Sequence, residues 1–351
     1  MTTVSYALTP QGLEQFKQLH HKAVETITAQ FYAAHGAEYT RFGDRGRKAC
    51  REDIEFHLDF LRPVLELGDL QPYTDYLRWF DEVLTARHIP TEHVAETLRQ
   101  LGDFFLDRIG GADGARISAA LTTAATESLQ GAEPGAASVV EKWPEQDRFE
   151  AALLNGDRRQ AIEIVSQLIK AGQSLIEIDV FLIQAALVSI GLKWQKNQVS
   201  VTQEHLATAT AQTVMADSFS KSAFPPLNGK RVLLACIEGN EHAVGLRMVS
   251  DAFELDGWNV QYLGANAPTR ALIEQVTDWK PDLVGLSISF PHQLSGTREA
   301  IMQMRTQLGD ACPPIMIGAA AVNHFPALAQ CIGADAHASD ALAALRHPLN
   351  S

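Results

Sequence analysis

The stretch EGNEHAVG, residues 238–245, places a histidine at position 242, shortly after two glutamates. The apolar run KRVLLACI precedes the stretch, and the helical pattern LRMVSDAFELDG follows it. His242 therefore lies in the turn between a predicted strand and a predicted helix. It could be a solvated loop residue, a catalytic base or a metal ligand, since a neutral imidazole serves both kinds of chemistry. Gly245 would let a bulky ring system lie against the start of the helix.

Small residues follow two further predicted strands. The loop SISFPHQ begins at Ser287 and Ser289, and the loop GAAAV begins at Gly318 and Ala319. Ligands of a parallel α/β sheet bind outside the carboxyl ends of its strands. We therefore expect these loops to share one edge with the loop of His242, where their small side chains leave room for a large ligand.

Four short apolar strands alternate with helical segments from residue 230 onward. The strands read RVLLACI, WNVQYLG, LVGLSIS and PIMIGAA, and the helical segments are 242–256, 268–279, 294–307 and 323–332. Strands that alternate with helices predict a Rossmann-like, doubly wound parallel sheet. We assign this sheet domain to residues 230–351.

Two helical regions precede the sheet. Residues 145–222 carry four helical segments with tight turns, which predict a four-helix-bundle cap; the segments are 145–155, 157–171, 175–192 and 202–220. Residues 131–144, GAEPGAASVVEKWP, are rich in Gly, Ala and Pro and predict a linker.

Residues 1–130 have helical periodicity almost throughout and predict an all-helical N-terminal domain, so the fold class is α plus α/β. Within it, we expect one helix to end at Gly68 and another to be stopped by Pro90. Thr91 is a predicted N-cap of the next helix.

The composition, the net charge and the lack of certain motifs argue against several classes of function. The 351 residues include 42 acidic and 29 basic ones, and the net charge of −13 disfavours direct binding to nucleic acids or anionic membranes. The four scattered cysteines form no CxxC pair, and the start MTTVSYALTPQ lacks a signal peptide pattern. We see no apolar run near the ~20 residues that span a bilayer, and expect a cytoplasmic protein.

No G-x-S-x-G, P-loop or G-x-G-x-x-G motif supports catalysis, so we expect no enzyme.

The stretch N-E-H-A-V-G, residues 240–245, resembles the D-x-H-x-x-G signature of the methionine-synthase type of cobalamin-binding domain. Further matches extend this resemblance over residues 145–340, namely Ser287-Ile288-Ser289, Gly318-Ala319 and YLGANAP with Tyr262, Leu263 and Gly264. The resemblance implies that His242 replaces the corrinoid's own base as lower axial cobalt ligand, the base-off/His-on state. It also assigns Asn240, Glu241, Gly245 and the matched residues to cofactor binding.

Asn240 departs from this signature, because the family has an aspartate that hydrogen-bonds the ligating histidine. An amide can still accept from the ring N–H, but it carries no charge to raise the basicity of the ligand. Glu238 or Glu241 could substitute for the missing carboxylate.

The cap carries a second resemblance. Trp194 is followed by Glu204-His205 in a W-x9-EH pattern, which is similar to the upper-face motif of CarH-type light-sensing cobalamin domains. The resemblance implies that Trp194 shields the adenosyl group of adenosylcobalamin and that the Glu-His pair lies near it. The alternative is that the tryptophan closes a bundle core and the pair is an ordinary helical turn. Gln195 stands where relatives with a bis-histidine light state have a histidine, so the upper ligand after light is either His205 or no protein group.

Basic residues cluster in EYTRFGDRGRKACREDIEFHL, residues 38–58, where Gly43 and Gly46 predict an interruption of the helix. Arginine forks pair with carboxylates, so Arg41, Arg45 and Arg47 suit an acidic ligand, although a solvated loop or a salt-bridged helix start explains them equally well. A helical N-terminal unit joined to such a cap and cobalamin domain resembles the photocobilins, and this implies biliverdin as a second chromophore.

The resemblances favour a light sensor in which breakage of the Co–C bond of adenosylcobalamin changes domain packing and oligomeric state. We expect a light-dependent homo-oligomer and an unknown downstream protein partner, since the sequence offers no output domain. A corrinoid methyl carrier of a methyltransferase system and a light-independent cobalamin-responsive regulator are the alternatives.

Overall fold

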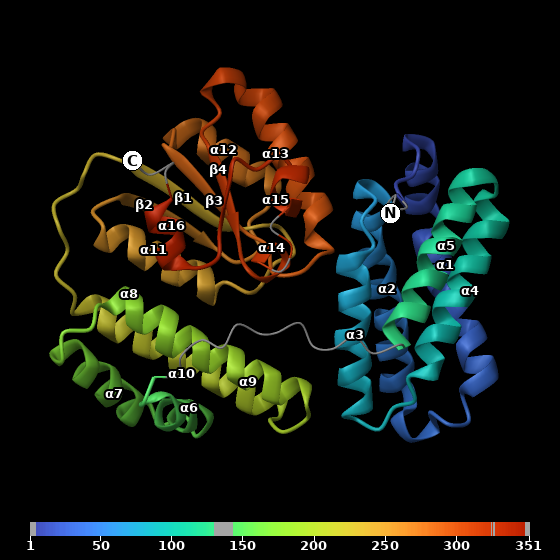
Figure 1. Cartoon of the computed structure of the whole chain (residues 1–351), viewed down its shortest axis with the longest axis horizontal. Coiled ribbons are helices and arrows are strands. Elements are labelled where there is room, and N and C mark those ends of the chain that lie inside the picture. Colours follow the sequence, from blue (N-terminus) through green and yellow to red (C-terminus); the bar gives the residue numbers. More distant parts are fainter. Residues whose placement is uncertain (1–4, 130–142, 324, 326, 348–351) are drawn as a thin grey trace. The chain divides into compact units, whose positions relative to one another are not determined.

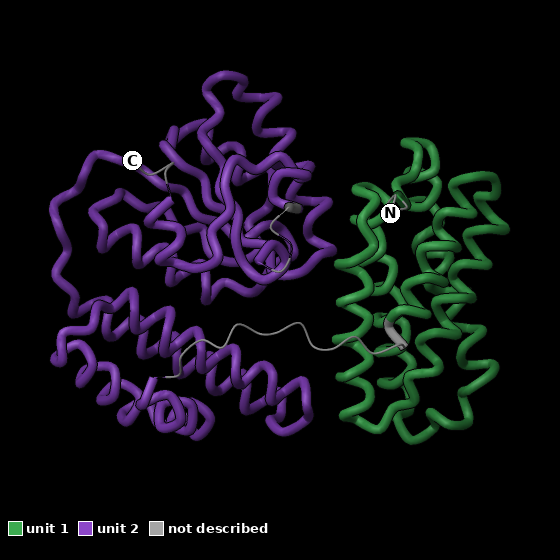
Figure 2. The backbone as a smooth tube through the Cα atoms, viewed as in Figure 1, with its two compact units in different colours: residues 1–135 green, residues 136–351 purple. Residues whose placement is uncertain are grey.

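The computed structural model describes residues 5–129, 143–323, 325 and 327–347. The chain divides into two compact units, residues 1–135 and 136–351 (Figure 2). Most of the linker that the sequence predicts over residues 131–144 lies outside the described residues.

The first unit is helical, as predicted. Its elements are α1 (Pro10–His35), a 3₁₀ turn η1 (Thr40–Phe42), α2 (Gly43–Leu67), α3 (Gln71–Thr85), α4 (Glu92–Ile109) and α5 (Gly111–Leu129) (Figure 1). Large side chains that are fully buried form its core, among them Phe16, Leu61, Tyr73 and Phe105. Gly68 ends α2 in the left-handed conformation, with φ 89°, which confirms the predicted stop.

Two local predictions in this unit need correction, at least in part, and a third, the N-cap at Thr91, is confirmed in position. Gly43, with φ 56°, does mark a break between η1 and α2, but Gly46 does not interrupt the helix, because α2 runs through it. A Cβ at Gly46 would lie 2.4 Å from the Cβ of Phe42, so glycine is needed for close packing here. Helix α3 ends at Thr85, well before Pro90. Thr91 is the N-cap of α4, but its side chain makes no capping hydrogen bond.

Four helical rods form the cap, as predicted. They are α6 (Gln146–Leu154), α7 (Arg158–Lys170), the continuous run α8 (Leu175–Ile178), η2 (Asp179–Gln184) and α9 (Ala185–Gln195), and α10 (Val201–Ser220). Capping boxes at Ser174 and Ser200 fix the starts of α8 and α10. The segment η2 is a π-helix, which is rare and often marks a functional site.

The run Leu175–Gln195 corrects the expectation that no segment is long and apolar enough to cross a membrane. By length and composition alone, its 21 residues meet that description. Within the cap, however, Ile178, Leu182, Ile183 and Ile190 of this run are buried in the hydrophobic core, which gives its apolar face a function in packing.

The sheet domain has five parallel strands in the order β2-β1-β3-β4-β5. They are β1 (Arg231–Cys236), β2 (Asn259–Gly264), β3 (Leu283–Ser287), β4 (Ile315–Gly318) and β5 (Ala336–Ala338). The first four were predicted, whereas β5 was missed because its sequence AHA is short and weakly apolar. The chain reverses direction across the sheet between β1 and β3, which makes this the topological switch point.

Helices cover both faces of the sheet, as a doubly wound fold requires (Figure 1). They are α11 (Val244–Leu255) and α16 (Ala341–Arg346) on one face, and α12 (Thr269–Trp279) and α13 (Gln293–Leu308) on the other. In place of the helix predicted over 323–332, the structure has α14 (Ala320–Asn323) and α15 (Ala327–Cys331); the turn η3 (Gly309–Ala311) follows α13.

The cap packs onto the sheet domain at one end. Helix α8 and the π segment η2 contact α11, and α8 also contacts α16. Met248 and Ala252 of α11 and Ala341 of α16 join the hydrophobic core of the cap. The opposite end of the α8–α9 run therefore lies about 20 Å along the helix from this anchor, at a rise of about 1.5 Å per residue.

Candidate functional site

The three loops singled out in the sequence meet at the carboxyl edge of the sheet. Cys236 at the end of β1 pairs with Ser287 at the end of β3, and Ser287 pairs with Gly318 at the end of β4. The loop that carries His242 follows β1 directly. The residues around the switch point are thus brought together as predicted, although their binding roles remain predictions.

Asn240 is fully buried and links two of these loops. Its amide nitrogen donates to the carbonyl oxygen of Ser287 at 2.9 Å, and its amide oxygen accepts from the backbone N–H of His242 at 3.1 Å. The oxygen therefore holds the backbone of His242 and not its imidazole ring, which differs from the expected contact. Neither suggested substitute makes that contact in the structure: Glu238 accepts from the backbone N–H of Thr269 at 3.1 Å, and Glu241 is exposed.

The imidazole of His242 is exposed and lies edge-on to the ring of Phe290, with centroids 5.0 Å apart. Within the described part of the chain, no side chain hydrogen-bonds either ring nitrogen. Burial raises the pKa of the nearby Cys236 thiol to about 11, so it stays protonated at neutral pH. His242 thus offers a free metal-binding nitrogen at this edge.

Two further polar side chains organise the site and were not predicted. Gln293 is buried; its amide oxygen accepts from the backbone of Ser289 at 2.9 Å and its nitrogen donates to the carbonyl of Gly239 at 3.0 Å. The side-chain oxygen of Asn266 accepts from the backbone N–H of Gly239 at 2.8 Å. The only sequence signal was their position in loops that follow strands.

The remaining predicted residues of the sheet domain line the same edge. A Cβ at Gly245 would meet nothing within 4 Å, so the start of α11 is open. The hydroxyl of Tyr262 donates to the carbonyl of Ala243 at 3.2 Å, which anchors the turn after His242. Leu263 is 39% exposed, and Gly264 has φ 76°, which favours glycine.

Gly318 and Ala319 form the tightest turn of the site. A Cβ at Gly318 would lie 2.8 Å from the carbonyl oxygen of Ala338 in the adjacent strand, so no side chain fits there. Ala319 has φ 81°, a backbone conformation that costs an L-residue energy and that glycine adopts freely. The geometry agrees with the comparison of this pair to a Gly-Gly step.

The predicted upper-face residues lie at the end of the cap that is distant from its anchor. Trp194 is half-buried in the last turn of α9 and does not belong to the hydrophobic core of the described cap. Glu204 and His205 lie in the first turn of α10, where Nδ1 of His205 is 2.6 Å from the carboxylate of Glu204. The His205 side chain is 75% exposed. Gln195 is buried and therefore does not share the exposed surface of His205.

The sequence and the fold of this chain were compared with those of known proteins. Residues 230–346 and 145–216 each match a family described as B12 binding domain. The HTH-type transcriptional repressor CarH of Myxococcus xanthus is 27% identical over 251 residues, or 69% of this chain and 82% of that protein. The dimethylamine corrinoid protein 3 of Methanosarcina mazei is 31% identical over 105 residues, or 30% of this chain and 62% of that protein. The solved monomethylamine corrinoid protein of Methanosarcina barkeri is 19% identical, covers 56% of this chain and 93% of its own, and has a TM-score of 0.48.

The two matched segments form a CarH-like cobalamin-binding module. The positions of its residues, considered without the comparisons, also fit a corrinoid. The ring nitrogens of His242 are available to cobalt, and the open start of α11 at Gly245 leaves room for a macrocycle.

The first unit holds a separate cavity of about 150 Å³. Among the aromatic residues of this unit, Tyr39 and Phe42 line it, whereas Tyr76 is buried in a stack on Phe60 with centroids 3.8 Å apart. Binding sites for drug-sized ligands have volumes of roughly 300–1,000 Å³, so a bilin requires this cavity to widen.

The predicted basic residues lie outside the cavity lining. Arg41, Arg45 and Arg47 are all exposed; Arg41 lies over the ring of Phe42 at 4.6 Å and Arg47 over that of Tyr32 at 5.1 Å. They are therefore near the cavity, because Phe42 is part of its wall. Their pairing with a ligand carboxylate remains a prediction.

Burial shifts the pKa values of three polar groups that line the cavity so that their neutral forms are favoured. Burial raises the pKa of Cys50 to about 12 and that of Asp53 to about 6, and it lowers the pKa of His57 to about 3. Nδ1 of His57 is 2.9 Å from the hydroxyl of Tyr76, which satisfies this buried ring. The cavity thus suits a largely apolar ligand with a few hydrogen-bonding groups.

Proposed function

We propose that the chain is a light sensor that binds adenosylcobalamin, with His242 as the lower axial cobalt ligand and Trp194, Glu204 and His205 over the upper face. The observation that carries the proposal is the unpartnered imidazole of His242 at the switch point of a CarH-like cobalamin-binding module. Adenosylcobalamin supplies a cobalt–carbon bond that visible light breaks.

The structure of the cap supports a mechanical response. The cap is anchored to α11 and α16 at one end, and Trp194 lies at the other end of the same helical run. An aromatic side chain packed on the adenosyl group would hold that free end in the dark. Loss of the packing partner would release it, and the freed surface would alter contacts between copies of the chain.

An absorption spectrum of the protein with adenosylcobalamin, before and after green light, tests the proposal. We expect a light-induced change in the wild-type protein, with altered spectra in both states for His242→Ala. His337→Ala, on β5 of the same domain, is the matched control and should behave like the wild type. A light response that is the same in His242→Ala and wild type would overturn the assignment of the lower ligand.

We further propose that His205 becomes the upper ligand after light. Its Nδ1 faces Glu204, so Nε2 remains for the metal, and its side chain is exposed. Gln195 offers no imidazole and is buried. An illuminated spectrum that is unchanged in His205→Ala would contradict this role.

A corrinoid methyl carrier is the second candidate function, because a dimethylamine corrinoid protein shares 31% identity over 105 residues. The carrier function would be supported if the protein binds methylcobalamin stably in light and transfers its methyl group to an added methyltransferase system. A response to cobalamin binding that is the same in darkness and light would favour the light-independent regulator.

Biliverdin as a second chromophore and a light-dependent homo-oligomer belong to the same proposal. Tyr39 and Phe42 would contact the bilin, and Arg41, Arg45 and Arg47 would meet its propionates. A new long-wavelength absorption band on addition of biliverdin tests the first. Light scattering in darkness and after illumination tests the second, and pull-down from dark and illuminated lysates tests for a downstream partner. The cytoplasmic location stays a prediction.

A further inference from the structure

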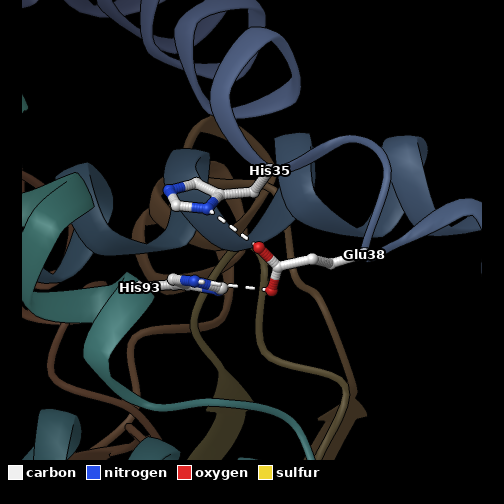
Figure 3. Close-up of side chains that lie close together, drawn as sticks. All are labelled: His35, Glu38 and His93. Atoms are coloured by element: carbon white, nitrogen blue, oxygen red, sulfur yellow. Dashed lines mark ion pairs between the residues drawn. The ribbon is translucent and has the colours of Figure 1, made fainter.

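We propose that His35, Glu38 and His93 form a binding site for a divalent transition-metal ion of the zinc class, separate from the cobalamin module. Each residue offers one ligand atom, and these atoms all lie within 4.8 Å of one another. Figure 3 shows both imidazoles facing the carboxylate of Glu38. Two imidazole nitrogens and one carboxylate oxygen match the donor set of three-ligand zinc sites.

The backbone brings these residues together from two helices. His35 is the last residue of α1, Glu38 lies one turn further in the loop, and His93 is in the first turn of α4. Nδ1 of His35 is 3.6 Å from one oxygen of Glu38, and Nε2 of His93 is 4.0 Å from the other. Ligand atoms of a tetrahedral zinc ion are roughly 3.4 Å apart, given bonds of about 2.0–2.1 Å, so the two rings and the exposed Glu38 side chain must approach one another to complete the geometry.

The outer nitrogens of both imidazoles already have the partners that metal sites use. Nε2 of His35 is 3.0 Å from the carboxylate of Glu96, whose other oxygen accepts from Gln100 at 3.0 Å. Nδ1 of His93 is 2.9 Å from the hydroxyl of Tyr39. A ligating histidine almost always donates its second N–H to a carboxylate, carbonyl or water. The tautomer in which each imidazole donates from its outer nitrogen leaves an inner lone pair directed toward Glu38.

The surroundings also favour a cation held close to an apolar wall. The two imidazole rings are 4.0 Å apart, and Phe31 lies against both of them. The side chains of His35 and His93 are only 18% and 15% exposed, so water competes weakly for their nitrogens. Glu38 and Glu96 supply negative charge that balances a divalent ion. Three protein ligands leave a fourth position for water or another small donor.

Zinc titration of the full chain, purified without cobalamin and stripped with a chelator, tests the site by calorimetry and elemental analysis. We expect one equivalent of Zn²⁺ per chain, lost in His35→Ala and His93→Ala. The outer-partner variant Glu96→Gln should bind about 10–100-fold more weakly. Co²⁺ should give visible ligand-field absorption that Zn²⁺ displaces.

His21→Ala removes an exposed histidine of α1 outside the cluster and is the matched control; it should retain one equivalent. Glu38→Gln keeps the test valid if a histidine variant misfolds, because Glu38 is 59% exposed. Circular dichroism verifies the helical content of each variant. Equal zinc stoichiometry and affinity in wild type, Glu38→Gln and Glu96→Gln would overturn the proposal.

Discussion

The side-chain nitrogen of Asn240 lies 2.9 Å from the carbonyl oxygen of Ser287 and ties the loop after β1 to the end of β3. This hydrogen bond crosses the switch point of the sheet. The same amide accepts from the backbone of His242 at 3.1 Å. An aspartate could accept from His242 but could not donate to Ser287. The asparagine therefore fixes the position of His242 through the backbone while leaving the imidazole ring free.

Asn240→Ala should destabilise the protein by about 1–3 kcal/mol, because it removes both hydrogen bonds of a fully buried side chain, each worth about 0.5–1.5 kcal/mol. The free energy of unfolding from urea titration of the cobalamin-free protein measures this change. Glu241→Gln, at the adjacent exposed position, is the control and should stay within about 0.5 kcal/mol of wild type. Equal stabilities of the two variants would show that the amide contacts do not stabilise the loop.

Ala319→Gly should stabilise the protein, by up to about 2.5 kcal/mol. Alanine at φ 81° carries a strain of about 1–3 kcal/mol, which exceeds the entropic cost of glycine, about 0.5–1 kcal/mol. Thermal unfolding of the cobalamin-free protein measures the difference. Ala320→Gly, one residue later in the short helix α14, should instead destabilise by about 1 kcal/mol. The opposite signs separate relief of strain from a general effect of glycine.

The sheet and the position of the site were predictable because strands β1 to β4 are apolar runs that end in small or polar residues. Parallel strands carry such ends to one edge, so His242, Ser287 and Gly318 followed from pattern alone. The sequence could not reveal Gln293, because it bonds to backbone atoms of two loops that are far apart in the chain.

Tertiary packing decided the other features that the sequence missed. His35 and His93 become neighbours only through the packing of α1 against α4. Asp179, the first residue of the π segment, interacts with Asp251 and Arg247 of α11, and a helical period of 3.6 residues gives no sign of this contact. Gly46 suggested a break, yet it serves the close approach of Phe42 to α2.

Asp179 should make the stability of the second unit depend on pH. Burial, and then the charge of Asp251, raise the pKa of Asp179 from its ordinary 3.8 to about 8. Arg247 faces both carboxylates and opposes the shift. The folded state holds this proton longer than the unfolded state, so the stabilising contribution of Asp179 is complete below pH 3.8 and is lost as pH rises to about 8. The slope from this group is at most about 1.4 kcal/mol per pH unit.

Asp179→Asn should remove this slope and make the protein more stable than wild type at pH 9. Urea unfolding at pH 6 and pH 9 measures it. Glu163→Gln, exposed on α7, is the control and should keep the wild-type dependence. Parallel pH profiles of wild type and Asp179→Asn would mean that the carboxylate ionises freely in the folded state.

Leu192 should contribute to cobalamin binding without contributing to folding. Its side chain is 51% exposed in α9, on the same face as Val188, which is 57% exposed, so Leu192→Ser removes little packing from the cobalamin-free protein. Contact with a corrinoid would bury roughly 40 Å² more apolar surface, worth about 1 kcal/mol, or about a fivefold change in dissociation constant. Leu227→Ser, 69% exposed in the connection before β1, is the matched control. Absorbance titration with adenosylcobalamin in darkness should therefore show weaker binding for Leu192→Ser alone; equal affinities in both variants would mean that this part of α9 does not cover the corrinoid.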